Sequence, residues 1–273
     1  VELDPEDVWT LRTRGIVHRS LNNYDESIKD FNSALKLDPD NPNTLTQRAI
    51  TYGDSLRFDD ALVGFHQALE LQPENTFILE RQGEIYRRMG CYQKALECLQ
   101  KALKLEPNNV NILRIQGSTY YALGSYKEGL ADMDRVIELG GDDYFTQGYR
   151  GAIYRALGYY SDALVELDKS INSRNIESFT LGERGAVYSR LGRPLEALKD
   201  FDNAFKIEVH HALDKHERSV AYLERALLYK TLGFYDDSIS DLNKALDLNP
   251  YNSLAIEERD KVFEIYKRLL IRA

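Results

Sequence analysis

The most regular feature of the chain is a pattern of small, aromatic and apolar positions that returns every 34 residues. It is marked by a small residue followed three positions later by tyrosine, or by histidine in the first instance. The small residues are Gly15, Ala49, Gly83, Gly117, Gly151, Gly185 and Ala226, separated by 34 residues five times and then by 41. Internal repetition at this period predicts a row of similar supersecondary units.

Each repeat contains two helical patterns when the small residue is numbered as position 8. A glycine-centred turn separates the two patterns, because glycine adopts the left-handed conformation that ends a helix without strain. These glycines are Gly90, Gly124, Gly158, Gly192 and Gly233. The first helix is preceded by a capping residue at Asp7, Asn41, Asn75, Asn109, Asp143 and Asn252. Prolines two residues before most of these caps stop the preceding helix. The local signals therefore predict a series of helix pairs.

The second helix of each pair has its own pattern. Alanine is frequent at positions 20 and 27, and phenylalanine or leucine stands at position 24, as in Phe31, Phe65 and Leu99. Small residues at positions 8 and 20 let two helices approach closely, while the large residue at position 24 fills the space beside them. The small residue at position 27 is expected to admit the first helix of the next repeat.

The combined pattern resembles the tetratricopeptide repeat (TPR). It consists of a small residue at position 8, Tyr at 11, Ala at 20, Phe at 24, Ala at 27 and Pro at 32. The resemblance covers nearly the whole chain. It implies an all-α fold, an α-solenoid in which antiparallel helix pairs stack into a right-handed superhelix. The seven expected repeats are 8–41, 42–75, 76–109, 110–143, 144–177, 178–211 and 219–252.

Three segments lie outside the seven expected repeats. Residues 1–7 align with the end of a truncated preceding repeat, and 212–218 are an insertion for which we expect lengthened flanking helices. Residues 253–273 are expected to form a capping helix that covers the last repeat, through a stripe of Val262, Ile265, Tyr266 and Leu269. The junction of repeats four and five carries Gly140-Gly141 in place of proline. Because glycine adds backbone freedom, we expect a soft point there.

Composition and charge narrow the class of protein. The 273 residues include 35 Lys+Arg and 44 Asp+Glu, a net charge of −9 with His neutral. An acidic surface argues against nucleic-acid binding, which needs cations for the phosphates. No apolar run is long enough to span a membrane, and no signal peptide is visible. Two cysteines, Cys91 and Cys98, are typical of a reducing, cytoplasmic compartment rather than of a disulfide scaffold.

Motifs for catalysis, metals or cofactors are missing from the sequence. There is no glycine-rich phosphate loop, nucleophile elbow or two-histidine metal motif. His211 and His216 are five residues apart, not the four that place two ligands on one helical face. Cys98 lies on a second helix, where packing is a more common role than nucleophilic attack. We therefore predict a non-enzymatic protein without cofactor or metal.

Positions 2, 5, 9, 12 and 13 of the first helices fall within one sector of about 100°, separate from the core positions. In TPR proteins this sector faces a concave groove where peptides bind. Here it is rich in aromatic and basic residues, although the whole chain is acidic. The candidate peptide-binding residues are Trp9, Arg12, Arg19, Asn43, Phe77, Arg87, Arg88, Asn111, Arg114, Tyr121, Phe145, Arg155, Phe179, Arg190 and Lys230.

Arginine forks suit carboxylate or phosphate groups, and aromatic faces supply apolar contact area. The sequence thus predicts a protein-interaction scaffold whose groove takes a peptide of acidic or phosphorylated character. In a simpler interpretation, the arginines only pair with Asp54, Glu80, Glu84 and Glu183 and stay solvated.

Two other kinds of partner are considered. The two-carboxylate clamp by which some TPR proteins hold the C-termini of Hsp70 or Hsp90 is not recognisable, because Ile16 and Phe77 replace two of its polar members. A structural or self-associating solenoid, joined end to end within a larger protein, is the alternative function.

Overall fold

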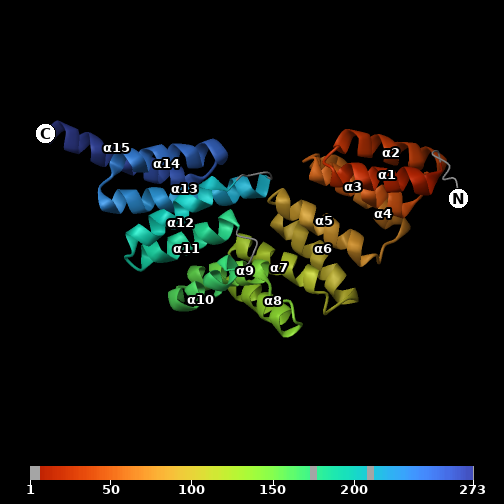
Figure 1. The fold of residues 1–273 in the computed structure, drawn as a ribbon, viewed down its shortest axis with the longest axis horizontal. Helices are drawn as coiled ribbons and strands as arrows, with labels where there is room; N and C mark the ends of the chain where they lie inside the picture. Colours follow the sequence, from red (N-terminus) through yellow and green to blue (C-terminus); the bar gives the residue numbers. More distant parts are fainter. Residues whose placement is uncertain (1–6, 173–176, 208–211, 273) are drawn as a thin grey trace. The chain divides into compact units, whose positions relative to one another are not determined.

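The structure is a computed structural model that describes residues 7–172, 177–207 and 212–272. Within these ranges every regular element is an α-helix (Figure 1). The helices are α1 (Val8–Ser20), α2 (Tyr24–Leu37), α3 (Pro42–Asp54), α4 (Phe58–Leu71), α5 (Thr76–Arg88), α6 (Tyr92–Leu105), α7 (Val110–Leu123), α8 (Tyr126–Glu138), α9 (Tyr144–Ala156), α10 (Tyr160–Ile171), α11 (Ser178–Arg190), α12 (Pro194–Lys206), α13 (Ala212–Leu232), α14 (Tyr235–Leu248) and α15 (Ser253–Arg272). The predicted all-α fold class is confirmed.

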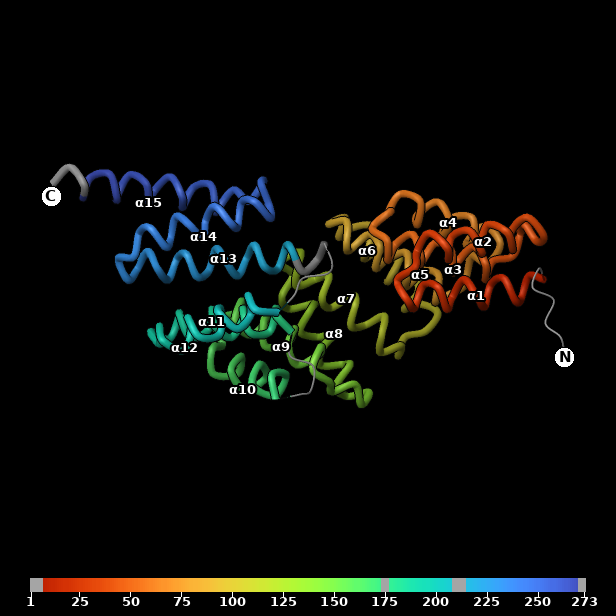
Figure 2. The backbone as a smooth tube through the Cα atoms, turned by 45° about the horizontal axis from the view of Figure 1, so that its top comes forward, coloured from red at the N-terminus to blue at the C-terminus, as the bar shows by residue number. Residues whose placement is uncertain are grey.

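The chain divides into two compact units, Val1–Leu139 and Gly140–Ala273, called here the N-terminal and C-terminal units. The division falls at the junction of repeats four and five, where Gly140 has a positive φ of 84°. Within each unit, consecutive helices pack as pairs, α1 with α2 through α13 with α14. The first helices of successive pairs also contact one another, as the tube in Figure 2 lets the reader follow. Each unit is therefore a row of first helices backed by second helices.

The predicted caps are confirmed at every position. The side chains of Asp7, Asn41, Asn75, Asn109, Asp143 and Asn252 each accept a hydrogen bond from the backbone N–H three residues further on. These bonds satisfy N–H groups that have no partner inside the helix. The caps therefore fix where the first helices begin.

A residue in the left-handed conformation stands at position 15 in the turn of each pair, and the five turns predicted to contain glycine adopt it. Gly90, for example, has a φ of 75°. Two repeats adopt the same conformation without glycine, at Asn22 with φ 60° and at Leu56 with φ 64°. Asparagine tolerates this region, but leucine is strained there by its Cβ. The turn geometry is thus imposed by helix packing even where the sequence lacks the residue that favours it.

The contact between positions 8 and 24 forms the core of every pair. The residues at position 24, sixteen residues after the small residue, are buried throughout: Phe31, Phe65, Leu99, Met133, Leu167, Phe201 and Leu242. A Cβ placed on Gly151 would lie 2.6 Å from Leu167 Cγ, and one on Gly83 would lie 2.9 Å from Leu99 Cγ. The two helices are thus as close as glycine permits.

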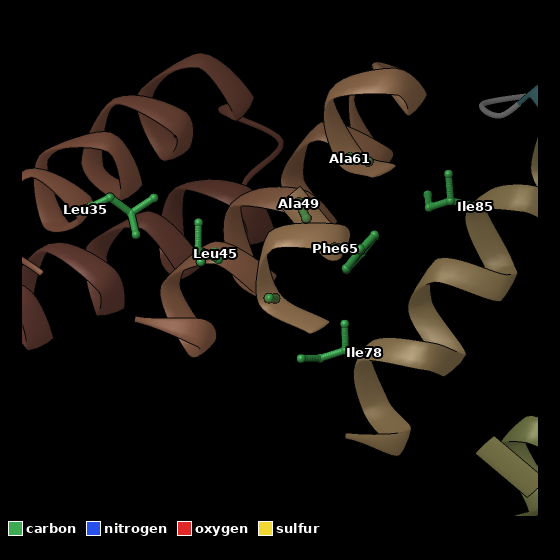
Figure 3. Packing of buried hydrophobic residues seen from close by; sticks show 8 residues of the cluster. Leu35, Leu45, Ala49, Ala61, Phe65, Ile78 and Ile85 are labelled. Carbon is green, nitrogen blue, oxygen red and sulfur yellow. The ribbon is translucent and has the colours of Figure 1, made fainter. Parts of the chain in front are cut away.

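Positions 20 and 27 complete this packing. Ala61 and Ala68 are fully buried, and Phe65 between them points toward Ile78 and Ile85 of the next pair (Figure 3). Where serine replaces alanine at position 20, its hydroxyl donates to the carbonyl of position 8, as Ser27 does to Gly15 at 2.8 Å. Within each unit, the predicted stacking of each pair on the next is confirmed.

The irregular segments differ in part from expectation. The insertion 212–218 forms the start of α13, which reaches 21 residues, whereas α12 keeps 13. Only the following helix is lengthened, because Arg218 donates to the carbonyls of Phe205 and Ile207 and so closes the end of α12. Residues 1–6, His210 and His211 lie outside the described residues.

The last helix, α15, packs on α14 and α13. Val262 is fully buried against Leu223 and Leu242, and Ile265 and Tyr266 are half-buried. Leu269 is 45% exposed, so the predicted apolar stripe makes contact only over its first part. The reason is length, because the Tyr266 hydroxyl already contacts Asp236 in the first turn of α14, so the later turns of α15 extend past the start of that helix.

Gly117→Leu is expected to overpack repeat four, because a Cβ at this position lies 2.9 Å from Met133 Cε and 3.2 Å from Asp132 Cβ. The free energy of unfolding should fall by about 1–3 kcal/mol, measured by urea unfolding. Ala131→Leu, at an exposed site on α8, is the control and should change it little. Equal stability of the two variants would contradict the close contact.

Leu56→Gly is expected to raise the free energy of unfolding, because it removes left-handed strain of about 1–2 kcal/mol while adding less backbone entropy to the unfolded chain. The reverse change at the equivalent turn, Gly90→Leu, should lower the melting temperature. The pair of thermal melts would refute the strain if both variants moved in the same direction.

Candidate interaction surface on the first helices

The candidate residues all lie on first helices but are divided between the two units. We call the surface at positions 2, 5, 6, 9, 12 and 13 of the first helices the first-helix surface. In the N-terminal unit, α1, α3, α5 and α7 carry Trp9, Arg12, Arg19, Asn43, Phe77, Arg87, Arg88, Asn111, Arg114 and Tyr121. In the C-terminal unit, α9, α11 and α13 carry Phe145, Arg155, Phe179, Arg190 and Lys230. Each unit therefore has its own first-helix surface.

Two large aromatic side chains of the N-terminal unit are open to solvent. Trp9 on α1 is 54% exposed and Phe77 on α5 is 41% exposed. The guanidinium of Arg81 lies over the Phe77 ring, 5.1 Å from its centroid. An apolar face beside a cation is an arrangement that favours contact with a partner side chain.

Arg19 and Arg81 are the electrostatic centre of this surface. Arg19 approaches Asp54 at 3.8 Å, but its Nη1 is buried without a hydrogen-bond partner among the described residues. Burial lowers the pKa of Arg19, and the nearby positive charge of Arg81 lowers it further against the opposing effect of Asp54. The nearest anion to Arg81 is Glu80 at 3.9 Å. Two guanidinium groups thus repel each other across α3 with incomplete compensation.

The other cations of this unit are more fully occupied. Arg87 is only 7% exposed and binds Glu84 of its own helix through two hydrogen bonds of 2.8 and 2.9 Å. Arg88 lies over the Phe58 ring at 5.0 Å, and Arg114 contacts Asn111 at 3.5 Å. The interpretation in which arginines pair with neighbouring carboxylates thus describes Arg87 well and Arg19 poorly.

The C-terminal unit shows a continuous chain of ion pairs. Arg155 binds Glu183 at 2.5 Å and reaches Glu224 at 3.5 Å, and Arg190 reaches the same Glu224 at 3.4 Å. Arg155 belongs to α9 and Glu224 to α13, so their side chains meet over α11. The side chains of α9 and α13 therefore reach each other across α11. The surface of this unit is internally paired.

Aromatic residues form the other half of the C-terminal surface. The Tyr149 ring lies 4.6 Å from that of Phe145 and 4.7 Å from that of Phe179, centroid to centroid. The Tyr149 hydroxyl donates to Glu217 of α13 at 3.2 Å, again across α11. Gly148 and Gly182 mark close approaches on the same helices, since a Cβ on Gly148 would lie 3.0 Å from Thr180 Oγ1 and one on Gly182 would lie 3.3 Å from Ala221 Cβ.

The two first-helix surfaces differ in net charge. The N-terminal one holds six arginines and three carboxylates, which leaves +3. The C-terminal one, counted through α15, holds four cations and five carboxylates, which leaves −1. Lys230 is bound by Glu258 of α15 at 2.6 Å. The predicted basic character is therefore a property of the N-terminal unit alone.

Position 6 of the first helix belongs to the same surface, although the sequence pattern did not single it out. It supplies Arg81, Tyr149, Glu183, Glu224 and Glu258, each of which contacts a candidate residue. Its angle on the helix lies next to that of positions 2 and 13. The helical period alone therefore places position 6 on this surface, although its residues are of mixed charge and do not continue the basic and aromatic pattern of the other five positions.

Other reactive chemistry is weak in the described part of the chain. The Cys98 thiol is buried and donates to Gln82 at 3.3 Å, and burial raises its pKa to about 11. A thiol with this pKa is not a nucleophile at neutral pH. Within the described ranges, no group of three His, Cys, Asp or Glu side chains has the geometry to hold a metal ion. None of the described helices has the length and apolarity of a membrane span.

Family models of the tetratricopeptide repeat match residues 77–109 and 219–252, and a TPR repeat model matches 15–55. Together with the fold, these matches place the chain in a family. The chain is a tetratricopeptide repeat protein. Proteins of this family generally act as non-enzymatic scaffolds for protein–protein interaction. No curated protein sequence gives a significant match.

Solved structures show the same fold at low sequence identity. A tetratricopeptide repeat protein from Parabacteroides merdae has a TM-score of 0.72 at 19% identity, over 93% of this chain and 98% of that one. A chain of the APC/C hetero-tetramer Cut9-Hcn1 has a TM-score of 0.73 at 16% identity, over 94% of this chain. Here the present chain spans only 50% of the similar chain. IFIT1, in a structure with Gppp-AAAA, has a TM-score of 0.69 at 15% identity, over 97% of this chain and 63% of that one.

Arg155→Ala is expected to lower the free energy of unfolding by about 2–4 kcal/mol, because Glu183 and Glu224 lose the cation between them in a partly buried site. Arg135→Ala is the matched control, since Arg135 is 45% exposed and pairs with Glu138. Its loss should amount to less than about 1 kcal/mol. Urea unfolding of both variants measures the difference, and equal losses would show that the ion-pair chain contributes nothing.

Proposed function

We propose that this TPR protein binds an acidic or phosphorylated segment of a partner protein on the first-helix surface of its N-terminal unit. The observation that carries the proposal is the incomplete compensation of Arg19 and Arg81. Arg19 has a buried Nη1 without a partner among the described residues, and Arg81 is 3.9 Å from its nearest carboxylate. A ligand carboxylate or phosphate would supply the missing anion.

The energetic reason is that both guanidinium groups are already partly desolvated. The desolvation penalty has been met during folding, so an incoming anion gains a charge-assisted hydrogen bond without removing much further water. Trp9 and Phe77 offer rigid apolar surface on the flanking helices α1 and α5. Arg12 on α1 adds a third cation to the same surface. The ligand that fits combines acidic groups with at least one apolar side chain.

The C-terminal unit is a weaker candidate for this ligand. Its cations Arg155, Arg190 and Lys230 are bound by Glu183, Glu224 and Glu258. An acidic peptide would have to displace these internal partners at a loss. The similar chain in the Cut9-Hcn1 hetero-tetramer belongs to a protein assembly, which supports a protein as the partner class.

Fluorescence anisotropy with labelled peptides tests the proposal. One peptide carries glutamate or phosphoserine around a phenylalanine, and its partner carries glutamine or serine at the same positions. The acidic peptide should bind more tightly, and its affinity should fall as salt rises. The double change Arg19→Gln with Arg81→Gln should weaken binding at least tenfold, which corresponds to about 1.4 kcal/mol.

Arg135→Gln, which removes a cation from the second helix α8, is the matched control and should leave binding unchanged. Equal affinity for the two peptides, or for the double variant and the parent, would refute the proposal. The alternative of a self-associating solenoid predicts instead a molar mass that rises with protein concentration in light scattering.

A further inference from the structure

Polar pairs accompany the core contact in most repeats. In four of them an arginine at position 7 of the first helix binds a carboxylate at position 23, sixteen residues further on. The pairs are Arg14–Asp30 at 2.5 Å, Arg150–Glu166 at 3.3 Å, Arg184–Asp200 at 2.7 Å and Arg225–Asp241 at 2.6 Å. The carboxylates of these pairs are buried, and each is compensated by its arginine.

Two other repeats lack this ion pair, but they also lack the buried carboxylate at position 23. Repeat three has Gln82 and Cys98, a neutral couple joined by a hydrogen bond of 3.3 Å. Repeat two has Arg48 at position 7 but Gly64 at position 23, and the arginine binds Asn32 of the preceding repeat at 2.8 Å. Neither repeat buries an acid without a base.

Repeat four keeps the acid and loses the base. Gln116 stands at position 7, while Asp132 stands at position 23 on α8. The Asp132 Cβ would lie 3.2 Å from a Cβ on Gly117, so the side chain packs against α7. Its Oδ2 atom is buried and has no hydrogen-bond partner among the described residues. Asp132 as a whole is half-buried, but an ionised carboxylate in this position leaves its Oδ2 atom with neither water nor a partner among the described residues.

The charged surroundings do not replace the missing arginine. Desolvation is the cause that raises the pKa of Asp132, to about 7, and no neighbouring charge contributes to that shift. The titratable groups on α7 and on α8 itself are Arg114, Tyr120, Tyr121, Tyr126, Lys127, Glu128, Asp134, Arg135 and Glu138. In repeat six, Asp168 of the preceding repeat also binds the position-7 arginine, Arg184. The equivalent residue before repeat four is Gln100, which instead donates to the Tyr120 hydroxyl at 3.2 Å.

We propose that Asp132 is a proton-binding site that links the stability of the α7–α8 pair to pH near neutrality. The neutral acid can be buried against Gly117 at small cost, whereas the anion is left without a partner. The folded chain therefore holds this proton at a pH where the unfolded chain has lost it. The stabilisation contributed by this group is greatest below the unfolded pKa of about 4, falls as pH rises, and is lost above about 7.

Asp132 lies close to one end of the first-helix surface of the N-terminal unit. α8 is the last helix of the N-terminal unit, and α7 presents Asn111, Arg114 and Tyr121 on the first-helix surface. Loosening of this pair would disturb that end of the surface. The linkage itself depends only on the burial of Asp132 and stands whether or not the surface binds an acidic ligand.

Urea unfolding of the full chain at pH 5, 6, 7 and 8 tests the proposal, with amide hydrogen exchange of α7 and α8 as a local readout. Asp132→Asn removes the titrating group while keeping its shape. The unfolding constant of the parent, relative to that of Asp132→Asn, should rise about tenfold per pH unit between pH 5 and 7 and then level off. Glu128→Gln, an exposed carboxylate on the same helix, is the control and should follow the parent.

Gln116→Arg restores the pair found in four other repeats and provides a second, independent variant. It should abolish the fall in stability between pH 5 and 7, because the carboxylate then gains an ionic partner. Parallel pH curves for the parent and Asp132→Asn would overturn the proposal. A parent-like pH dependence in Gln116→Arg would overturn it as well, even if Asp132→Asn failed to fold.

Discussion

The structure depends on one steric fit, the contact between a large residue at position 24 of a second helix and a glycine or alanine at position 8 of the first. In repeat five, any Cβ on Gly151 would lie 2.6 Å from Leu167. Because the fit recurs in every repeat, the two helices of each pair pack in the same way. Within each unit, the contacts between successive first helices, and hence the first-helix surface of that unit, follow from this packing.

The polar pair at positions 7 and 23 has the same spacing of sixteen residues because it lies one residue away from the core contact. Packing that brings Gly185 to Phe201 also brings Arg184 to Asp200. Because the pair is buried, both charged residues are needed together, since one buried charge without its partner destabilises the fold. Repeat four departs from this rule at Gln116 and Asp132, in the pair that ends the N-terminal unit.

The same helical frame carries two different electrostatic solutions. In the C-terminal unit, Arg155, Glu224 and Arg190 alternate in sign and hold one another. In the N-terminal unit, Arg19 and Arg81 face each other without enough carboxylates. A scaffold can bind a charged partner where its own charged side chains lack counter-ions, and it gains rigidity where those side chains are paired with one another.

The sequence alone determined the helix pairs, the caps of their first helices and the five glycine turns, because Asn75, Gly90 and the 34-residue period act through residues close in the chain. It also placed all fifteen candidate residues on first helices. Only the tertiary structure decided which of the candidate cations are paired with carboxylates of the same chain. Arg155 meets Glu224 across 69 residues, and Asp132 lacks the partner that its counterparts have. Such pairings depend on how successive first helices pack and on burial, neither of which a local pattern encodes.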